Sequence, residues 1–196
     1  MSEKTEQKRR LILDCAGKVF ADKGYRAVTM KDIVEACGIS RGGLYLYFPS
    51  VEDVFLAVLD MEEKISDAEI SDEALENATD GEILLWFLKT QKKEILKKKD
   101  SLMMAKYEYA FSCNDKKRVS FLKKEMDKAV LVLQNILERG TESGEFACFD
   151  PKNEAKDMIY AIEGMKLLSL TTGINEKKVD SEFLHMMERI VIEEEE

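Results

Sequence analysis

A chain of 196 residues, of which 45% are hydrophobic and 35% charged, has enough apolar side chains for a packed core beneath a polar surface. It has no run of about 18 uncharged apolar residues, which excludes a membrane span, and its start, MSEKTEQKRR, lacks the apolar core of a secretion signal, so we expect a cytoplasmic protein. The net charge of −9 argues against nucleic-acid binding by the chain as a whole.

The charge is unevenly distributed along the chain. Residues 1–48 contain nine Lys/Arg and six Asp/Glu, a net charge of +3, so the remaining residues carry −12. Because salt screens exposed charges over about 8–10 Å, a basic head can attract phosphate locally, while an acidic body repels DNA and orients the encounter. The distribution therefore permits DNA binding by the N-terminal segment alone.

Apolar residues recur at helical spacing along the chain without a convincing strand pattern, which predicts an all-α fold. The first helix is expected over about 6–23, and Gly24 ends it. Thr29 is the expected N-cap of a short second helix over 30–37.

A tight turn follows the second helix. Gly38 closes that helix, and Ser40 opens a third one only two residues later, which matches the short glycine-containing turn of a helix-turn-helix. Ser50, with Asp53 three residues later, is a capping pattern for a fourth helix.

The third helix, within ISRGGLYLYF, contains two glycines, and each costs about 1 kcal/mol relative to alanine in a helix. On a helical wheel Leu44 and Phe48 face the core, whereas the glycines face outward between two tyrosines. A recognition helix that enters a major groove can use such a face, because glycine lets the backbone approach the DNA. The alternative is that the glycines relieve crowding against another helix.

Several side chains around this helix are suited to DNA. The tyrosine hydroxyls can reach phosphates, and Leu46 can touch a thymine methyl. Arg41 is long enough for either a guanine edge or a phosphate, and free N–H groups at the start of the second helix add a phosphate site. The predicted DNA-contacting residues are Thr29, Lys31, Arg41, Gly42, Gly43, Tyr45, Leu46 and Tyr47.

The segment RRLILDCAGKVFADKGYRAVTMKDIVEACGISRGGLYLYFPSVEDVF closely resembles the DNA-binding head of the tetracycline-repressor (TetR/AcrR) family of bacterial transcriptional regulators. The resemblance implies about nine helices, a homodimer and release of DNA when a ligand binds the body. By this resemblance, the residues expected to contact DNA are Thr29, Arg41, Gly42, Tyr45 and Tyr47.

Two positions depart from the family's pattern. Val51 stands where members commonly have a lysine, so one phosphate contact is expected to be missing. Leu46 replaces an often aromatic or polar residue, which leaves the base preference open.

The chain is accordingly divided into a DNA-binding domain, 1–50, and a helical ligand-binding and dimerisation domain, 51–196. Further helices are expected over about 80–98, 101–113, 116–142, 152–172 and 179–193.

The last two helices show more apolar surface than one small bundle needs, and helix pairs from two subunits can form a four-helix bundle. The alternative is that these residues complete the core of one chain. The residues predicted for the dimer interface are Met158, Ile162, Met165, Phe183 and Met187.

The middle helices supply aromatic and sulfur-containing side chains suited to an apolar pocket for a small-molecule inducer. A carboxylate among them could pair with a cationic ligand. The candidate ligand-binding residues are Trp86, Phe87, Met103, Met104, Tyr107, Glu108 and Phe111.

The sequence offers no catalytic Ser/His/Asp or Cys/His set and no phosphate-binding glycine loop, so we expect no enzyme and no cofactor. It has one histidine, and its four cysteines lack metal or redox spacing, so we expect no metal site and four buried thiols. The leading hypothesis is a ligand-released repressor of operator DNA. The alternative is a nucleoid or division factor controlled by a protein partner.

Overall fold

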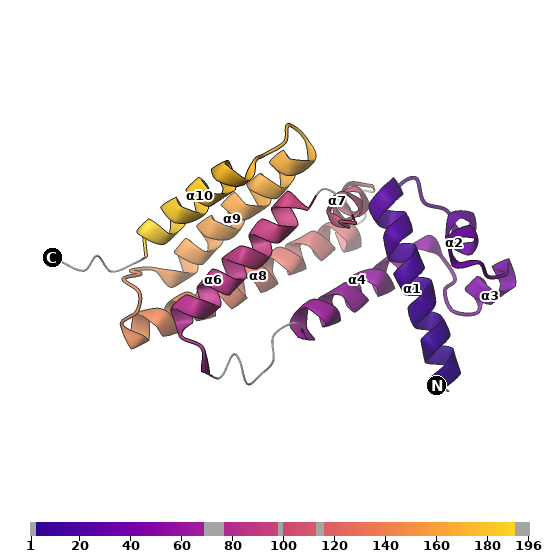
Figure 1. Ribbon diagram of the computed structural model, residues 1–196, viewed down its shortest axis with the longest axis horizontal. Helices are drawn as coiled ribbons and strands as arrows, with labels where there is room; N and C mark the ends of the chain where they lie inside the picture. Colours follow the sequence, from indigo (N-terminus) through magenta and orange to yellow (C-terminus); the bar gives the residue numbers. More distant parts are fainter. Residues whose placement is uncertain (1–2, 69–76, 98–99, 113–115, 191–196) are drawn as a thin grey trace. The chain divides into compact units, whose positions relative to one another are not determined.

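A computed structural model describes residues 3–68, 77–97, 100–112 and 116–190 (Figure 1). Within these ranges the chain forms nine α-helices and no strand, which confirms the predicted all-α fold and the expected helix number. None of the helices in the described ranges combines the length and the apolarity needed to cross a membrane.

The chain forms two compact units. The first comprises Met1–Ser71 with Lys98–Val119, and the second comprises Asp72–Lys97 with Ser120–Glu196. These units reflect packing and not function, so the functional division at residue 50 stays a prediction.

The first unit contains five helices and the beginning of a sixth. They are α1 (Glu3–Lys23), α2 (Met30–Cys37), α3 (Arg41–Tyr45), α4 (Val51–Ala68), α7 (Met103–Phe111) and the first residues of α8. The long α1 packs against α2, α4 and α7, so it is the scaffold of this unit.

An aromatic cluster lies where α1, α4 and α7 meet. Phe20 of α1 and Phe55 of α4 are fully buried, with ring centroids 4.8 Å apart. Tyr25 contacts Phe55 at 4.9 Å and Tyr109 of α7 at 5.0 Å. Such ring pairs add about 0.5–1.5 kcal/mol each beyond the burial of their area, so the cluster holds α7 firmly to the N-terminal helices.

The second unit is a helical bundle. Its helices are α6 (Asp80–Leu96), the larger part of α8 (Lys116–Ser143), α9 (Pro151–Leu170) and α10 (Glu176–Glu188). Asp150 caps α9 by accepting a hydrogen bond from the Asn153 backbone N–H at 3.2 Å, with Pro151 at the first helical position, and α6 packs against both α9 and α10.

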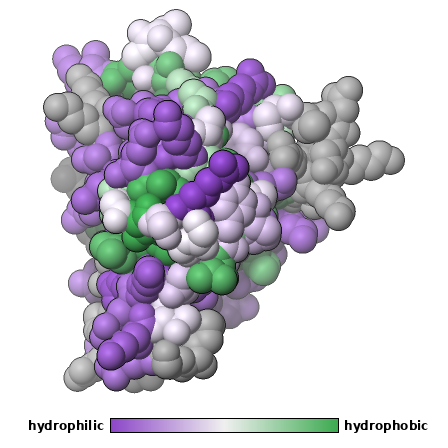
Figure 2. Space-filling view, turned by 90° about the vertical axis from the view of Figure 1, so that its right-hand side faces the viewer, coloured by the Kyte–Doolittle hydropathy of each residue, from purple (hydrophilic) through white to green (hydrophobic). Residues whose placement is uncertain are grey.

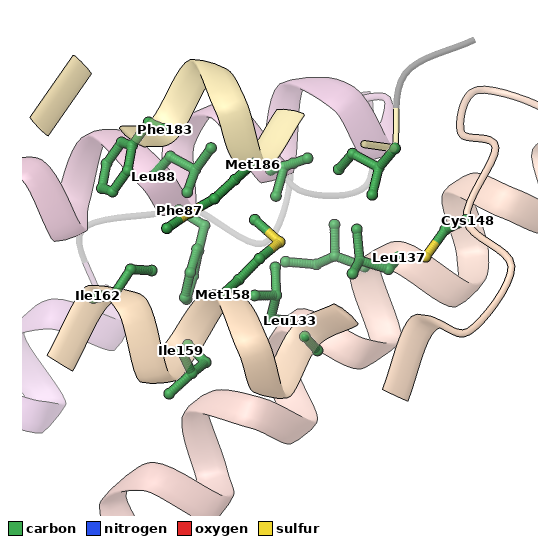
Figure 3. Packing of buried hydrophobic residues seen from close by; sticks show 14 of the residues in the cluster. Phe87, Leu88, Leu133, Leu137, Cys148, Met158, Ile159, Ile162, Phe183 and Met186 are labelled. Atoms are coloured by element: carbon green, nitrogen blue, oxygen red, sulfur yellow. The ribbon is translucent and has the colours of Figure 1, made fainter. Parts of the chain in front are cut away.

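The core of this bundle contains most of the residues predicted for the dimer interface. Met158 and Ile162 of α9 are completely buried, and Figure 3 shows them within the core formed with side chains of α6, α8 and α10. Met165 and Phe183 are also buried, and Met187 is half-buried against the same cluster. These side chains therefore pack within one chain, as the alternative hypothesis had it, because the apolar stripes of α9 and α10 face α6.

The cysteines differ in burial. Cys148 is buried, as expected, whereas Cys15 and Cys37 are half-buried, and Cys113 lies outside the described residues. The prediction of buried thiols was therefore wrong for two of them.

Gly140 provides a test of the bundle's packing. The Phe146 ring lies directly on it, where a Cβ would collide with the ring, while a Cβ on Gly17 of α1 would meet Val58 at an ordinary 3.5 Å. We expect Gly140→Ala to lower the free energy of unfolding by about 1–3 kcal/mol, because overpacking displaces Phe146. Gly17→Ala is the control and should raise it by up to about 1 kcal/mol. Urea unfolding at fixed protein concentration measures both, and a neutral Gly140→Ala would contradict this account.

Candidate functional site

Local hydrogen bonds define the start of α2. The Thr29 side chain accepts the Asp32 backbone N–H at 3.3 Å, while the Asp32 carboxylate accepts the Thr29 backbone N–H at 2.8 Å, so the predicted cap is a complete capping box. The ammonium of Lys23 lies 2.5 Å from Asp32. Hydrogen bonds from Lys23 and Thr29 hold the pKa of the Asp32 carboxyl well below its usual range. The end of α1 is thereby tied to the start of α2.

The turn between α2 and α3 has the geometry that the sequence predicts. Gly38 adopts the left-handed conformation at φ 64°, which a side chain rarely permits. Ser40 then caps α3 by accepting the Gly43 backbone N–H at 3.1 Å. Since both ends of the turn are defined, α3 leaves α2 in one direction.

The α3 segment presents two faces. Leu44 is completely buried and Phe48 is 4% exposed, so both face the core as predicted. The exposed side carries Arg41, Gly42, Tyr45 and Leu46, while Gly43 and Tyr47 are half-buried. Figure 2 looks onto the side where α2 and α3 lie and shows hydrophobic groups in small areas bordered by hydrophilic ones.

The two glycines of α3 differ in their surroundings. A Cβ on Gly42 would have no described atom within 4 Å, whereas one on Gly43 would lie 3.1 Å from the Ser40 hydroxyl. Crowding against another helix therefore does not explain Gly42 within the described part of the chain. Gly43, in contrast, leaves room for the cap of its own helix.

Among the predicted DNA-contacting residues, Arg41 begins α3 and Tyr45 ends it, while Thr29 and Lys31 lie at the start of α2. The Arg41 guanidinium lies over the Tyr45 ring, 5.5 Å from its centroid, so the two side chains form one exposed cation–π pair. Thr29 and Lys31 are exposed at the start of α2, and Lys31 makes a 3.6 Å ion pair with Glu35.

Polar contacts connect α7 to the N-terminal helices within the first unit. The Glu108 carboxylate accepts the Arg26 backbone N–H at 2.9 Å, and the Arg26 guanidinium donates to the Phe111 carbonyl at 3.2 Å. The Tyr109 hydroxyl donates to Glu52 of α4 at 2.8 Å. Gly24, at φ 74°, leaves room for Glu108, because a Cβ there would lie 2.5 Å from its carboxylate. Sequence reasoning missed this link, since its partners are more than 50 residues apart.

The candidate ligand-binding residues divide between the units. Trp86 and Phe87 belong to α6, where Trp86 is 37% exposed and Phe87 is buried in the bundle core. Those of α7 belong to the first unit, where the Tyr107 and Phe111 rings stack with centroids 6.2 Å apart. Met103 is buried there, Met104 is exposed, and Glu108 is engaged with Arg26. In the described ranges, no group of three or more His, Cys, Asp or Glu residues is placed to hold a metal ion.

A capped helix-turn-helix, with an exposed glycine-containing face on its second helix, defines a DNA-binding protein whose body is helical. Residues 12–58 match the family model described as bacterial regulatory proteins, tetR family, and residues 83–180 match the tetracyclin repressor-like C-terminal domain. The chain belongs to the TetR family and is a DNA-binding transcriptional regulator.

Individual relatives match over most of the chain. The HTH-type transcriptional regulator YfiR of Bacillus subtilis is 30% identical over 152 residues, which cover 76% of this chain and 73% of YfiR. The regulator QacR of Staphylococcus aureus is 26% identical over 170 residues, 85% of this chain and 88% of QacR. A Saccharomonospora viridis protein, solved in complex with choline, has a TM-score of 0.79 at 23% identity and shares the fold over 95% of this chain and 99% of its own.

Gly42→Ala separates a DNA-contacting role from a structural one. Because the position is open, the substitution should leave the melting temperature unchanged or raise it slightly, since alanine favours helix by about 1 kcal/mol over glycine. It should also weaken DNA binding several-fold, because the new methyl group holds the backbone away from the groove. Thermal unfolding and a fluorescence-anisotropy titration with duplex DNA measure the two effects. Unchanged affinity would remove Gly42 from the interface.

Proposed function

We propose that this protein is a homodimeric repressor that binds a palindromic operator and is released from it by a small apolar or amphipathic inducer. The observation that carries the proposal is the exposed face of α3, where open space over Gly42 lies beside Arg41 and Tyr45. Since operator DNA lies in the bacterial cytoplasm, the proposal places the protein there.

On the DNA, the backbone at Gly42 would approach the major groove, and Leu46, the highly exposed apolar residue that follows α3, would contact base edges. Arg41 would leave the Tyr45 ring to reach a base or a phosphate. Val51 begins α4 at the position of the family's lysine, so phosphate contacts there would come from the backbone N–H groups and not from a side chain.

Relatives support a small-molecule inducer without identifying it. The Saccharomonospora viridis structure holds choline, and another protein of the same fold, AibR, was solved with isovaleryl coenzyme A and operator DNA. Among relatives similar over 26–28% of this chain, KstR2 of Rhodococcus jostii is named a repressor and FasR of Mycolicibacterium smegmatis an activator. The sign of regulation therefore differs among these relatives.

The contacts of α7 support a mechanism by which inducer binding would change the positions of the DNA-binding helices. Glu108 and Phe111 hold Arg26, and Tyr109 holds Glu52 of α4, so a displacement of α7 would pull on the segment between α1 and α2 and on α4. An inducer that favours a displaced α7 would shift the population toward dimers whose recognition helices are wrongly spaced. The size of that shift is set by the difference between the inducer's affinities for the two states.

The dimer surface proposed here uses the exposed side of α9 and α10, since their other side is buried in the core. Tyr160, Leu167 and Leu168 of α9 and Leu184 of α10 are 40–60% exposed. Gly164 lies between them along α9 with no described atom within 4 Å of a Cβ built there, so a second helix could approach closely. Two copies joined in this way would form the four-helix interface typical of such dimers.

The double variant Leu168→Glu/Leu184→Glu tests that surface. Two carboxylates in an apolar interface cannot be desolvated cheaply, so we expect a dimer of the unmodified protein to become monomeric at micromolar concentration. Leu131→Glu is the control, because Leu131 of α8 has an exposed fraction between those of Leu168 and Leu184. Sedimentation equilibrium distinguishes the species. A dimeric double variant would place the interface elsewhere.

Selection of genomic fragments by the purified protein at near-physiological salt tests the whole proposal. We expect a palindrome whose half-sites lie about 34–36 Å or a multiple of it apart. On that operator, Tyr47→Phe should lower affinity roughly 2- to 13-fold on all sequences, the value of one lost hydrogen bond. Arg41→Ala should change the sequence preference if Arg41 reads a base, and equal losses on specific and random DNA would make it a phosphate contact. An absence of any enriched site would contradict the repressor.

A further inference from the structure

A charged side chain continues the buried stripe of α1 toward its N-terminus. Arg9 precedes Ile12 and Leu13 by three and four residues, which places it on the same face of the helix as these two buried side chains. The Arg9 guanidinium lies over the ring of Phe48, 5.4 Å from its centroid. Phe48 is buried and lies three residues after the end of α3. The contact therefore places a positive charge of α1 beside the C-terminal end of the α3 segment.

The guanidinium of Arg9 is suited to bind an anion while it rests on this ring. A phenyl ring offers no oxygen acceptor, so the N–H donors of Arg9 remain for another group. Arg9 is half-buried, and in the part of the chain that the structure describes no carboxylate forms an ion pair with it. A guanidinium already held in place loses less freedom on binding, and its fork of donors matches the oxygens of a phosphate.

Positive charge lies at both ends of the α3 segment. Arg41 begins α3, and Arg9 lies at the other end, over Phe48. Lys8 and Arg10, the sequence neighbours of Arg9, are exposed and add to the local positive charge. Phosphate contacts beside a recognition helix fix its register and orientation on the duplex, so charge at both ends of the segment is where such contacts are needed.

We propose that Arg9 binds a phosphate of the operator backbone at the C-terminal end of the α3 segment and thereby helps to orient the recognition helix in the groove. The inference rests on the proposed entry of α3 into a major groove. Arg9 precedes the residues that match the family model, and it is not among those that the sequence predicts to contact DNA. Since a phosphate carries no sequence information, Arg9 should contribute equally on operator and random DNA.

Three variants separate phosphate binding from mere packing on Phe48. Arg9→Met removes the charge and the donors but keeps a long apolar chain, whose sulfur packs favourably on an aromatic ring. Arg9→Lys keeps the charge. Arg10→Met is the matched control, because it removes the same charge one residue away, from an exposed position of α1. Thermal unfolding shows whether each variant is folded.

Fluorescence-anisotropy titrations of the full-length variants, at several salt concentrations, measure the contact on the selected operator and on a random duplex. Arg9→Met should weaken binding to both by a similar factor, about tenfold or more, the value of a hydrogen bond to a charged group. Its slope of log affinity against log salt should be shallower by about 0.9, because one phosphate fewer is neutralised. Arg9→Lys should retain the slope, and Arg10→Met should change it much less than Arg9→Met does.

Chemical footprinting supplies a second measurement on the unsubstituted protein. Phenylglyoxal modifies accessible guanidinium groups, and mass spectrometry locates the modified residues. Bound duplex DNA should protect Arg9 from the reagent more strongly than it protects Arg10. This readout does not depend on the folding of any variant.

Two results would overturn the phosphate contact alone: DNA binding in which Arg9→Met and Arg10→Met change the salt slope equally, or equal modification of Arg9 with and without DNA. Either result would leave Arg9 as a side chain that only covers Phe48. Failure of the unsubstituted protein to bind any duplex would instead overturn the proposed function, and this contact with it.

Discussion

A helix of five residues that contains two glycines cannot persist alone in water, so the DNA-facing surface depends on burial of the side chains behind it. Leu44 and Phe48 are almost wholly buried, and each contributes about 1.5–3 kcal/mol relative to exposure. The burial offsets the cost of the glycines, which can then face outward. Ser40 and Gly38 set the orientation of α3, because they define how the chain enters the helix.

Buried aromatic side chains also hold together the part of the first unit that lies away from the DNA-facing surface. Phe20 and Phe55 form the base of the first unit, and Tyr25 and Tyr109 complete an aromatic cluster that includes α7. Rings and the hydrogen bonds of Glu108 both connect α7 to the N-terminal helices, so α7 packs as part of the first unit. Because α7 packs in the first unit but follows α6 of the second unit in sequence, it is well placed to couple the two functions.

Sequence reasoning succeeded where the signal is local. The helix starts at Thr29, Ser40 and Ser50 were predictable, because a cap and its partner are three residues apart. It failed where partners are distant: nothing in the spacing of Arg26 and Glu108 indicates that they meet. An apolar stripe also does not say which neighbour covers it. Met158 therefore lies in its own chain's core, although the stripe was expected to face a second subunit.

The open space over Gly42 has a consequence for how operators are distinguished. A surface that replaces side chains with backbone offers few donors and acceptors to base edges, so little of its selectivity can come from reading bases directly. The fit of such a surface depends instead on the width and curvature of the groove into which it inserts. Discrimination should then depend on the sequence-dependent shape and stiffness of the DNA, including base pairs that no side chain touches.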